Sequence, residues 1–319
     1  MRIGILGTGN MGRMHAEIFK QISEVAISGI CGRDAMKTIE FAKIIGTKPY
    51  TDCQELLTDK NIDIVDVCLP VSLHSEWVIR ALEAGKDVIC EIPLCYTGEE
   101  MEEMRLVAQK SGKRILVALY NRFQSQYKYI YEYIKSGKIG KPKAVFANRR
   151  SPNYYASKDI VVNLMLHDFD YIYWLLGKPR SVFCKGTAPS EGFEQHAVAV
   201  LEYDDVLVSL EGTTIMPDTF PFSTSLRVIG ETGAIDLNWY WSSNGPVNDV
   251  LLYPEAGEAT KLKIPDYDPY FAECKYMLEC IAGKTQSELL DLGSISDSMR
   301  LIFLARESLR QGGVKIRVD

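Results

Sequence analysis

The protein has 319 residues, of which 46% are hydrophobic and 24% are charged, an ordinary balance for a globular chain with sizeable cores. Its 36 basic and 42 acidic side chains leave a net charge of −6, which gives no support for binding to nucleic acids or anionic membranes. No run reaches the roughly 18 apolar residues that a membrane-spanning helix needs. The first segment reads as a strand rather than a signal peptide, so we expect a cytoplasmic protein.

The chain opens with a short apolar strand, residues 1–6, and a segment that can be helical follows a glycine-rich turn. A Gly-x-Gly-x-x-Gly pattern between a strand and a helix is typical of dinucleotide-binding folds. The first glycine allows the tight turn, the second lets the backbone approach a pyrophosphate, and the third lets the helix pack closely. The helix N-terminus then offers unpaired N–H groups to the phosphates. We predict that the dinucleotide is bound by Gly7, Thr8, Gly9, Asn10, Met11 and Gly12.

The second predicted strand, residues 25–31, ends at the position that selects the cofactor in dinucleotide-binding folds. An acidic residue at this position binds the ribose hydroxyls of NAD, whereas an arginine accommodates the additional phosphate of NADP. Gly32 occupies the acidic position and Arg33 follows it, which favours NADP, with NAD as the alternative. Asp34 is a possible acidic substitute, although it is more simply the N-cap of the next helix.

Strands and helices alternate from here to about residue 119, which predicts a doubly wound parallel sheet. Gly85 ends one predicted helix, and Thr97 with Glu100 forms a capping-box pattern at the start of another. The strands are predicted at residues 62–70, 87–91 and 114–118, and the helices at 50–57, 72–84 and from 97. We therefore predict an α/β fold whose Rossmann dinucleotide-binding domain spans residues 1–119.

After residue 120 the pattern changes, and residues 120–319 are predicted to form a second domain for substrate binding and oligomerisation. Strands are predicted at residues 144–147, 181–184, 196–201, 206–210 and 225–229, and helices at 125–136, 163–176, 269–282 and 296–310. This order predicts an α+β domain with a large, open, mostly antiparallel sheet. Because the second face of such a sheet must also be covered, we expect a homodimer or homotetramer that packs through it.

The eight cysteines form no Cys-x-x-Cys motif, and most lie in apolar surroundings, which predicts small buried thiols in a reducing compartment. The four histidines, His15, His74, His167 and His196, are not spaced with cysteines in a zinc pattern. The sequence therefore predicts no metal site.

Several motifs in order and spacing resemble the Gfo/Idh/MocA oxidoreductase family over nearly the whole chain. They are residues 7–12, 67–70 with His74, 84–93, 121–123, 137–140, 167–170 and 230–234. The resemblance implies a Rossmann domain, a C-terminal domain with an open sheet, a dimer or tetramer, and NAD- or NADP-linked chemistry on sugars or polyols. It also implies cofactor contacts at Leu69, Pro70, His74, Glu91 and Ile92.

The catalytic set that the family carries is a lysine in Glu-Lys-Pro, an aspartate, and a histidine four residues after the aspartate. In this chain those positions hold Ile92, Asn163 and His167. Isoleucine cannot transfer a proton, and asparagine keeps the hydrogen-bonding shape of aspartate without its charge. The resemblance therefore implies that His167 is the acid–base residue, supported by Asn163 on the same helical face. Without the family pattern, His167 would read as a satisfied core residue.

For the substrate we predict contacts from Tyr120, Arg122, Arg149, Tyr154 and Lys158. Lys158 also reads as an ordinary solvated lysine, and Arg149 as a solvated charge that needs no ligand. Asp170 is interpreted as structural.

Three functions remain open. The first is an NADP- or NAD-linked dehydrogenase or reductase of a sugar, polyol or related carbonyl compound. The second is a reductase of a conjugated substrate, because the biliverdin reductase branch of the superfamily also lacks the lysine. The third is a cofactor-binding sensor without turnover, a possibility raised by Ile92 and Asn163.

Overall fold

The computed structural model describes residues 1–152, 159–187 and 193–319. It divides into two compact units, each assembled from two stretches of sequence. The first unit contains residues 1–123 and 268–296, and the second contains residues 124–267 and 297–319. The domain boundary at residue 119 stays a prediction, because a unit that is compact in space need not be continuous in sequence.

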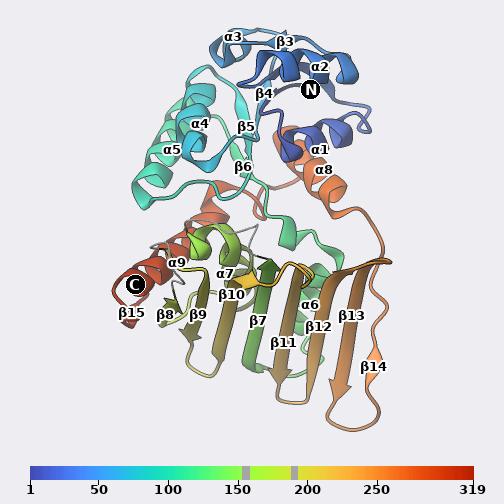
Figure 1. Ribbon diagram of the computed structural model, residues 1–319, viewed down its shortest axis with the longest axis vertical. Coiled ribbons are helices and arrows are strands. Elements are labelled where there is room, and N and C mark those ends of the chain that lie inside the picture. The colour runs from blue at the N-terminus through green and yellow to red at the C-terminus, as the bar shows by residue number, and fades with distance from the viewer. Residues whose placement is uncertain (153–158, 188–192) are drawn as a thin grey trace. The chain divides into compact units, whose positions relative to one another are not determined.

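The first unit is built on a six-stranded parallel sheet with the order β3-β2-β1-β4-β5-β6 (Figure 1). Its strands are β1 Arg2–Leu6, β2 Ala26–Cys31, β3 Pro49–Tyr50, β4 Ile64–Val67, β5 Asp87–Cys90 and β6 Ile115–Val117. Its α-helices are α1 Asn10–Phe19, α2 Ala35–Ile45, α3 Cys53–Thr58, α4 His74–Glu83, α5 Gly98–Ser111 and α8 Pro269–Ile281, and it also contains the short 3-10 helices η1 Val71–Leu73 and η2 Tyr120–Arg122. The predicted doubly wound α/β fold is confirmed, and the central strands β1, β4 and β5 are almost entirely buried, as in a parallel sheet covered on both faces.

Local signals in the sequence set the ends of these helices. The Asp34 side chain caps α2 by accepting a hydrogen bond from the backbone N–H of Lys37. Thr97 and Glu100 form the predicted capping box at the start of α5. Gly85 follows α4 with a φ of +74°, a left-handed conformation that glycine adopts without strain.

The second unit contains a nine-stranded sheet with the order β14-β13-β12-β11-β7-β10-β9-β8-β15 (Figure 1). Its strands are β7 Pro142–Pro152, β8 Ser181–Thr187, β9 His196–Glu202, β10 Leu207–Met216, β11 Ser223–Gly230, β12 Gly233–Ser242, β13 Gly245–Pro254, β14 Thr260–Lys261 and β15 Ile316–Arg317. Among the described strand pairs of this nine-stranded sheet, only β7 and β10 are parallel. The prediction of a mostly antiparallel sheet is therefore confirmed. The helical elements are α6 Ser125–Lys135, the π-helix η4 Val161–Met165, α7 Leu166–Leu176 and α9 Leu292–Arg310, within which the division between the units falls.

Two predicted segments differ from the structure, and one hairpin was not predicted. The helix predicted at residues 163–176 is a π-helix over Val161–Met165 and becomes an α-helix only at Leu166–Leu176. The segment predicted as a helix over residues 50–57 holds the end of β3, and its helix begins at Cys53. The long hairpin of β12 and β13 was not predicted. Apolar and polar residues alternate in the first half of β12, but the aromatic run at 239–241 ends this alternation, and β13 shows no alternation.

The two faces of the nine-stranded sheet differ in burial. Along β7, Val145, Ala147 and Arg149 are buried, whereas Phe146 between them is 43% exposed. The buried face packs against η4, where a Cβ on Gly212 of β10 would lie 2.3 Å from the Met165 side chain. The opposite face carries a row of exposed apolar side chains that the strand register brings into line across the sheet, namely Leu207, Ile229 and Tyr253.

No helix among the described residues is long and apolar enough to cross a lipid bilayer.

Candidate functional site

The glycine-rich turn after β1 is fixed by close backbone contacts. Gly7 has a φ of +122°, and a Cβ there would lie 2.2 Å from the Cys68 carbonyl oxygen. A Cβ on Gly12 would lie 2.2 Å from the Gly7 carbonyl oxygen. Gly9 differs, because nothing lies within 4 Å of the position its Cβ would take. Two glycines are therefore required by packing, while the third borders open space.

The N-terminus of α1 faces that open space without a side-chain cap. Gly9 is the N-cap residue, and it has no side chain to accept a hydrogen bond from the first amides of the helix. Arg13 holds the turn from the side, since its Nε donates to the Thr8 carbonyl at 3.1 Å and its guanidinium lies 4.4 Å from the centre of the Phe41 ring. An uncapped helix N-terminus with free space in front of it fits the diphosphate of a dinucleotide.

The end of β2 lies directly against this turn. A Cβ on Gly32 would approach the Thr8 side chain to 2.7 Å and the Thr38 hydroxyl to 2.8 Å, so no larger residue fits there. Arg33 and Asp34 are exposed. One carboxylate oxygen of Asp34 accepts the Lys37 amide at 3.1 Å, and the other lies 4.0 Å from the Lys37 ammonium group. Asp34 therefore acts as a helix cap, and Arg33 is the side chain beside it that extends into solvent.

His74 connects the loop after β4 to the loop after β5. Its ring nitrogens lie 2.7 Å from the Leu69 carbonyl oxygen and 2.8 Å from the Pro93 carbonyl oxygen. Ile92 is half-buried in the second loop, and its amide donates to the Glu91 carboxylate at 3.1 Å. The structure thus brings Leu69, His74 and Ile92 together at the carboxyl ends of β4 and β5, the edge where ligands bind in open α/β sheets.

A buried charged cluster lies beneath this edge, and sequence reasoning missed it. His15 of α1 is fully buried, with Nδ1 3.0 Å from the Asp66 carboxylate and Nε2 3.0 Å from the Glu91 carboxylate. The Nδ1 contact has hydrogen-bond geometry, whereas Nε2 meets Glu91 as a charge contact without that alignment. The only sign of this cluster in the sequence is a histidine on an apolar helix face. Such a position does not indicate which residues contact the histidine.

The neighbours of His15 decide its charge. Burial is the largest single influence and opposes the imidazolium, but the charge of Asp66, the contact with the Cys68 sulfur and the hydrogen bond to Asp66 together outweigh burial and raise the pKa of His15 well above its usual value. The nearby Glu273 of α8 is also buried, and its burial, followed by the charge of Glu91, raises the pKa of that carboxyl group. His15 is therefore a buried cation held between two anions.

The same cluster contains atoms that a metal ion could use. Nitrogen, carboxylate and sulfur ligand atoms of His15, Asp66 and Cys68 lie within 4.8 Å of one another. The ion pair already uses the protonated Nδ1 of His15, and a protonated nitrogen cannot coordinate a metal. The observed ion pair and a metal ion at this position are therefore mutually exclusive.

In the second unit, His167 lies in the first turn of α7, directly after the π-helix that contains Asn163. The Asn163 side-chain amide donates to the Asp159 carbonyl oxygen at 3.0 Å. The protein packs densely around the half-buried His167. This burial is the main cause that lowers the pKa of its imidazole well below the usual value, and the positive charge of Arg149 is the smaller second cause. His167 is therefore neutral at pH 7 and can accept a proton.

Arg149 of β7 is buried and forms two hydrogen bonds with the Asp168 carboxylate, of 2.9 and 3.1 Å. This bidentate ion pair joins the sheet to the helix that carries His167. Asp170, two residues further along α7, accepts a hydrogen bond from the Ser298 hydroxyl at 2.9 Å.

The remaining predicted substrate residues lie in different places. The Tyr120 ring lies 4.2 Å from the Tyr270 ring, and the buried Arg122 donates to the Leu289 carbonyl oxygen at 2.5 Å, both within the first unit. Tyr154 and Lys158 lie outside the described residues.

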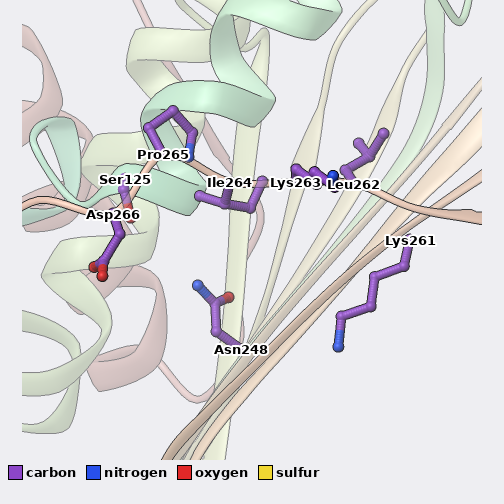
Figure 2. A pocket seen from close by; sticks show the side chains of 8 residues that line it. All are labelled: Ser125, Asn248, Lys261, Leu262, Lys263, Ile264, Pro265 and Asp266. Atoms are coloured by element: carbon purple, nitrogen blue, oxygen red, sulfur yellow. The ribbon is translucent and has the colours of Figure 1, made fainter.

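A cavity of about 640 Å³ lies in the second unit (Figure 2). Its lining residues come from α6, β13, β14 and the segment after β14, namely Ser125, Asn248, Lys261, Leu262, Lys263, Ile264, Pro265 and Asp266. None of the predicted site residues is among them, so this cavity is separate from the predicted catalytic histidine.

Comparison with known proteins decides the family. Residues 1–119 match the oxidoreductase family with an NAD-binding Rossmann fold, and residues 127–236 match the GFO/IDH/MocA C-terminal domain. The chain belongs to the Gfo/Idh/MocA family. It is an oxidoreductase with an NAD-binding Rossmann domain, as the resemblance predicted.

Curated relatives in the family include inositol dehydrogenases. The chain is 32% identical to myo-inositol 2-dehydrogenase of Thermotoga maritima over 272 residues, which is 81% of this chain and 80% of the relative. It is 28% identical to inositol 2-dehydrogenase of Azotobacter vinelandii over 253 residues, or 73% of this chain and 72% of the relative.

Solved structures share the fold at lower identity. UDP-N-acetylglucosamine 3-dehydrogenase of Acidithiobacillus ferrooxidans has a TM-score of 0.84 at 20% identity and covers 98% of both chains. An oxidoreductase of Agrobacterium radiobacter, solved in complex with NAD+, L-tartaric acid and magnesium, has a TM-score of 0.82 at 17% identity and covers 100% of this chain and 98% of its own. Both confirm the fold.

A first prediction follows from the difference between the closely packed Gly12 and the open Gly9. Gly12→Ala should lower the melting temperature by several degrees, because overpacking against the Gly7 carbonyl costs about 1–3 kcal/mol. Gly9→Ala is the matched control and should leave the melting temperature within about 2 °C, since its Cβ meets open space. Thermal unfolding followed by circular dichroism measures both, and equal losses would contradict this assignment of the glycines.

The buried cation makes a second prediction. His15→Gln should lower the free energy of unfolding by about 3–5 kcal/mol near pH 6, because two buried carboxylates lose their partner. Since the folded-state pKa of His15 is raised, its stabilisation is complete below its unfolded pKa of about 6.5 and is lost as the pH rises through the folded value. The difference between wild type and variant should therefore shrink from about pH 6 to pH 9 in urea unfolding. Asp66→Asn should weaken the same pH dependence, and a constant difference would refute a charged His15.

Proposed function

We propose that the protein is an NADP-linked dehydrogenase or reductase of a sugar or polyol, with His167 as its acid–base residue. The observation that carries the proposal is the uncapped N-terminus of α1, which faces open space at Gly9 in a chain of the NAD-binding oxidoreductase family. The inositol 2-dehydrogenase relatives support a polyhydroxylated substrate.

The proposed mechanism divides the work between cofactor and chain. The nicotinamide, when bound, accepts or donates the hydride. Backbone amides at the start of α1 hold the diphosphate, and the loops joined by His74 form the edge beside it. When the substrate hydroxyl is oxidised, the neutral His167 accepts its proton on a ring nitrogen, and in the reverse direction the imidazolium returns it.

The absence of the family lysine shifts this proton transfer onto His167. Ile92 occupies the lysine position and supplies only apolar surface. A histidine whose pKa is lowered stays neutral at physiological pH and therefore needs no lysine to keep it a base. Asn163 keeps a hydrogen-bonding side chain near the same helix turn without adding negative charge.

A cofactor-binding sensor without turnover is the second candidate function. It is favoured by the single observation that the positions of lysine and aspartate hold Ile92 and Asn163. Such a protein would bind the dinucleotide but leave a panel of polyols and sugars unchanged.

We also propose that two or four copies associate through the open face of the nine-stranded sheet. Phe146, Leu207, Ile229 and Tyr253 are exposed on that face, and their burial would stabilise the assembly.

Cofactor preference provides a third prediction. NADPH should bind more tightly than NADH, and Arg33→Ala should weaken NADPH by about tenfold, the loss of one charge-assisted hydrogen bond to the ribose phosphate. The same variant should change NADH affinity by less than about twofold. Titration of purified protein, followed by cofactor fluorescence, measures all four affinities. Preference for NADH, with no effect of Arg33→Ala, would overturn the NADP assignment.

The acid–base role of His167 provides a fourth prediction. His167→Ala should lower kcat by about 10²–10⁴-fold with cofactor affinity unchanged. Because the pKa of His167 is lowered, kcat/KM for alcohol oxidation should stay flat from high pH down to about 6.5 and fall only below it. Steady-state rates with inositols and sugars across pH test both statements. Full activity of the variant would exclude His167 as the proton acceptor.

The assembly provides a fifth prediction. Phe146→Glu places a charge on the open face and should reduce the mass measured by light scattering after size exclusion by half or more. Met36→Glu, at a residue that is 76% exposed on α2 of the first unit, is the matched control and should leave the mass unchanged. A monomeric wild type would refute the proposal.

A further inference from the structure

Two thiols that are 22 residues apart in sequence meet beside the glycine-rich turn. Cys31 ends β2 and Cys53 begins α3, and their Sγ atoms lie 2.6 Å apart. Both are free thiols. By comparison, the sulfur contacts of Cys68, Cys90, Cys95 and Cys280 with oxygen or nitrogen are 3.3–3.6 Å long. The two sulfurs are thus already within a small movement of bonding distance, which is about 2.05 Å in a disulfide.

The two thiols differ in access and in reactivity. Cys53 is half-buried, whereas Cys31 is 1% exposed. The hydrogen bond between them lowers the pKa of Cys53 and, together with burial, raises the pKa of Cys31. Since the thiolate is the attacking species, Cys53 is the residue that a reagent reaches first, and Cys31 is placed to resolve the product.

The backbone at Cys31 and Gly32 is tied to the turn that faces the proposed cofactor site. The Cys31 carbonyl oxygen accepts a hydrogen bond from the Gly7 amide at 2.8 Å. The next residue, Gly32, packs so closely on Thr8 that a Cβ would approach its side chain to 2.7 Å. Because this packing is close, a displacement of Cys31 also displaces residues 7–9 and Arg33.

We propose that Cys31 and Cys53 form a reversible disulfide that weakens dinucleotide binding to the first unit. The disulfide site stands on the geometry of the two thiols, and its effect on the cofactor rests on the proposed function. Nothing in the sequence indicated the pair, because the two cysteines are far apart in the chain and form no motif.

The oxidant is a small-molecule disulfide. The Cys53 thiolate attacks one of its sulfur atoms, forms a mixed disulfide and releases one small thiolate, which takes up a proton. Cys31 loses its proton and attacks the Cys53 sulfur, which expels the second small thiolate. In total, two protein thiols become one protein disulfide, and one reagent disulfide becomes two thiols.

The charges around the pair indicate which reagent to use. The Asp52 and Glu55 carboxylates flank Cys53 and are exposed, and they act on the Cys31 thiol as negative charges. An anionic reagent is repelled there, so the neutral 2-hydroxyethyl disulfide is the suitable probe.

The first measurement identifies the bond. Reduced full-length protein is treated with 2-hydroxyethyl disulfide, the remaining thiols are alkylated, and the protein is digested with trypsin without reductant. The expected product is peptide 21–33 joined to peptide 44–60, with the mass of their sum less two hydrogen atoms. It should disappear with dithiothreitol and be absent from Cys53→Ser. Failure to find it after complete reaction of the wild type overturns the proposal.

The second measurement tests the consequence. The affinities for NADPH and NADH are measured by titration of oxidised and reduced wild type. We expect the oxidised form to bind at least about fivefold more weakly, and we expect reduction to restore the affinity. Cys280→Ser, which removes a thiol elsewhere in the first unit, should retain this response, and Cys53→Ser should lose it. The joined peptide with unchanged affinity overturns the regulatory effect. Absence of cofactor binding in the reduced protein overturns both that effect and the proposed function, while the joined peptide still establishes the disulfide site.

Discussion

The turn between β1 and α1 is the constraint on which the first unit depends. Gly7 adopts a left-handed conformation against the Cys68 carbonyl, and Gly12 packs on the carbonyl of Gly7 itself. These contacts leave no room for a side chain at either position. They direct the N-terminus of α1 toward the open space at Gly9, where its amides have no side-chain cap. The binding capacity of the unit is therefore a consequence of backbone packing rather than of polar side chains.

Charge at the same edge of the sheet is held below the surface. Protonated His15 compensates Asp66 and Glu91, and the amide of Ile92 hydrogen-bonds to that same Glu91 carboxylate. The loop after β5, which carries Ile92, is thus anchored to the helix that carries the glycine turn. This anchor fits a role for Glu91 in holding the loop rather than in proton transfer.

The second unit uses an ion pair for a related purpose. Arg149 on β7 binds Asp168 with two hydrogen bonds, and Asp168 follows His167 directly on α7. The pair fixes the helix on the sheet, and the positive charge of Arg149 adds to burial in keeping His167 neutral. One buried arginine therefore both positions the predicted base and tunes it.

The sequence by itself determined the Rossmann architecture, the open antiparallel sheet, the helix caps at Asp34 and Thr97, and the family, because each depends on local periodicity, turn chemistry or motif spacing. Only the tertiary structure decided the partners of His15 and the meeting of Cys31 with Cys53, since both join residues that are distant in the chain. It also decided the π-helix at Asn163, which no local pattern indicates. Long-range packing assigns such side chains their charge and neighbours, and a single sequence does not carry that information.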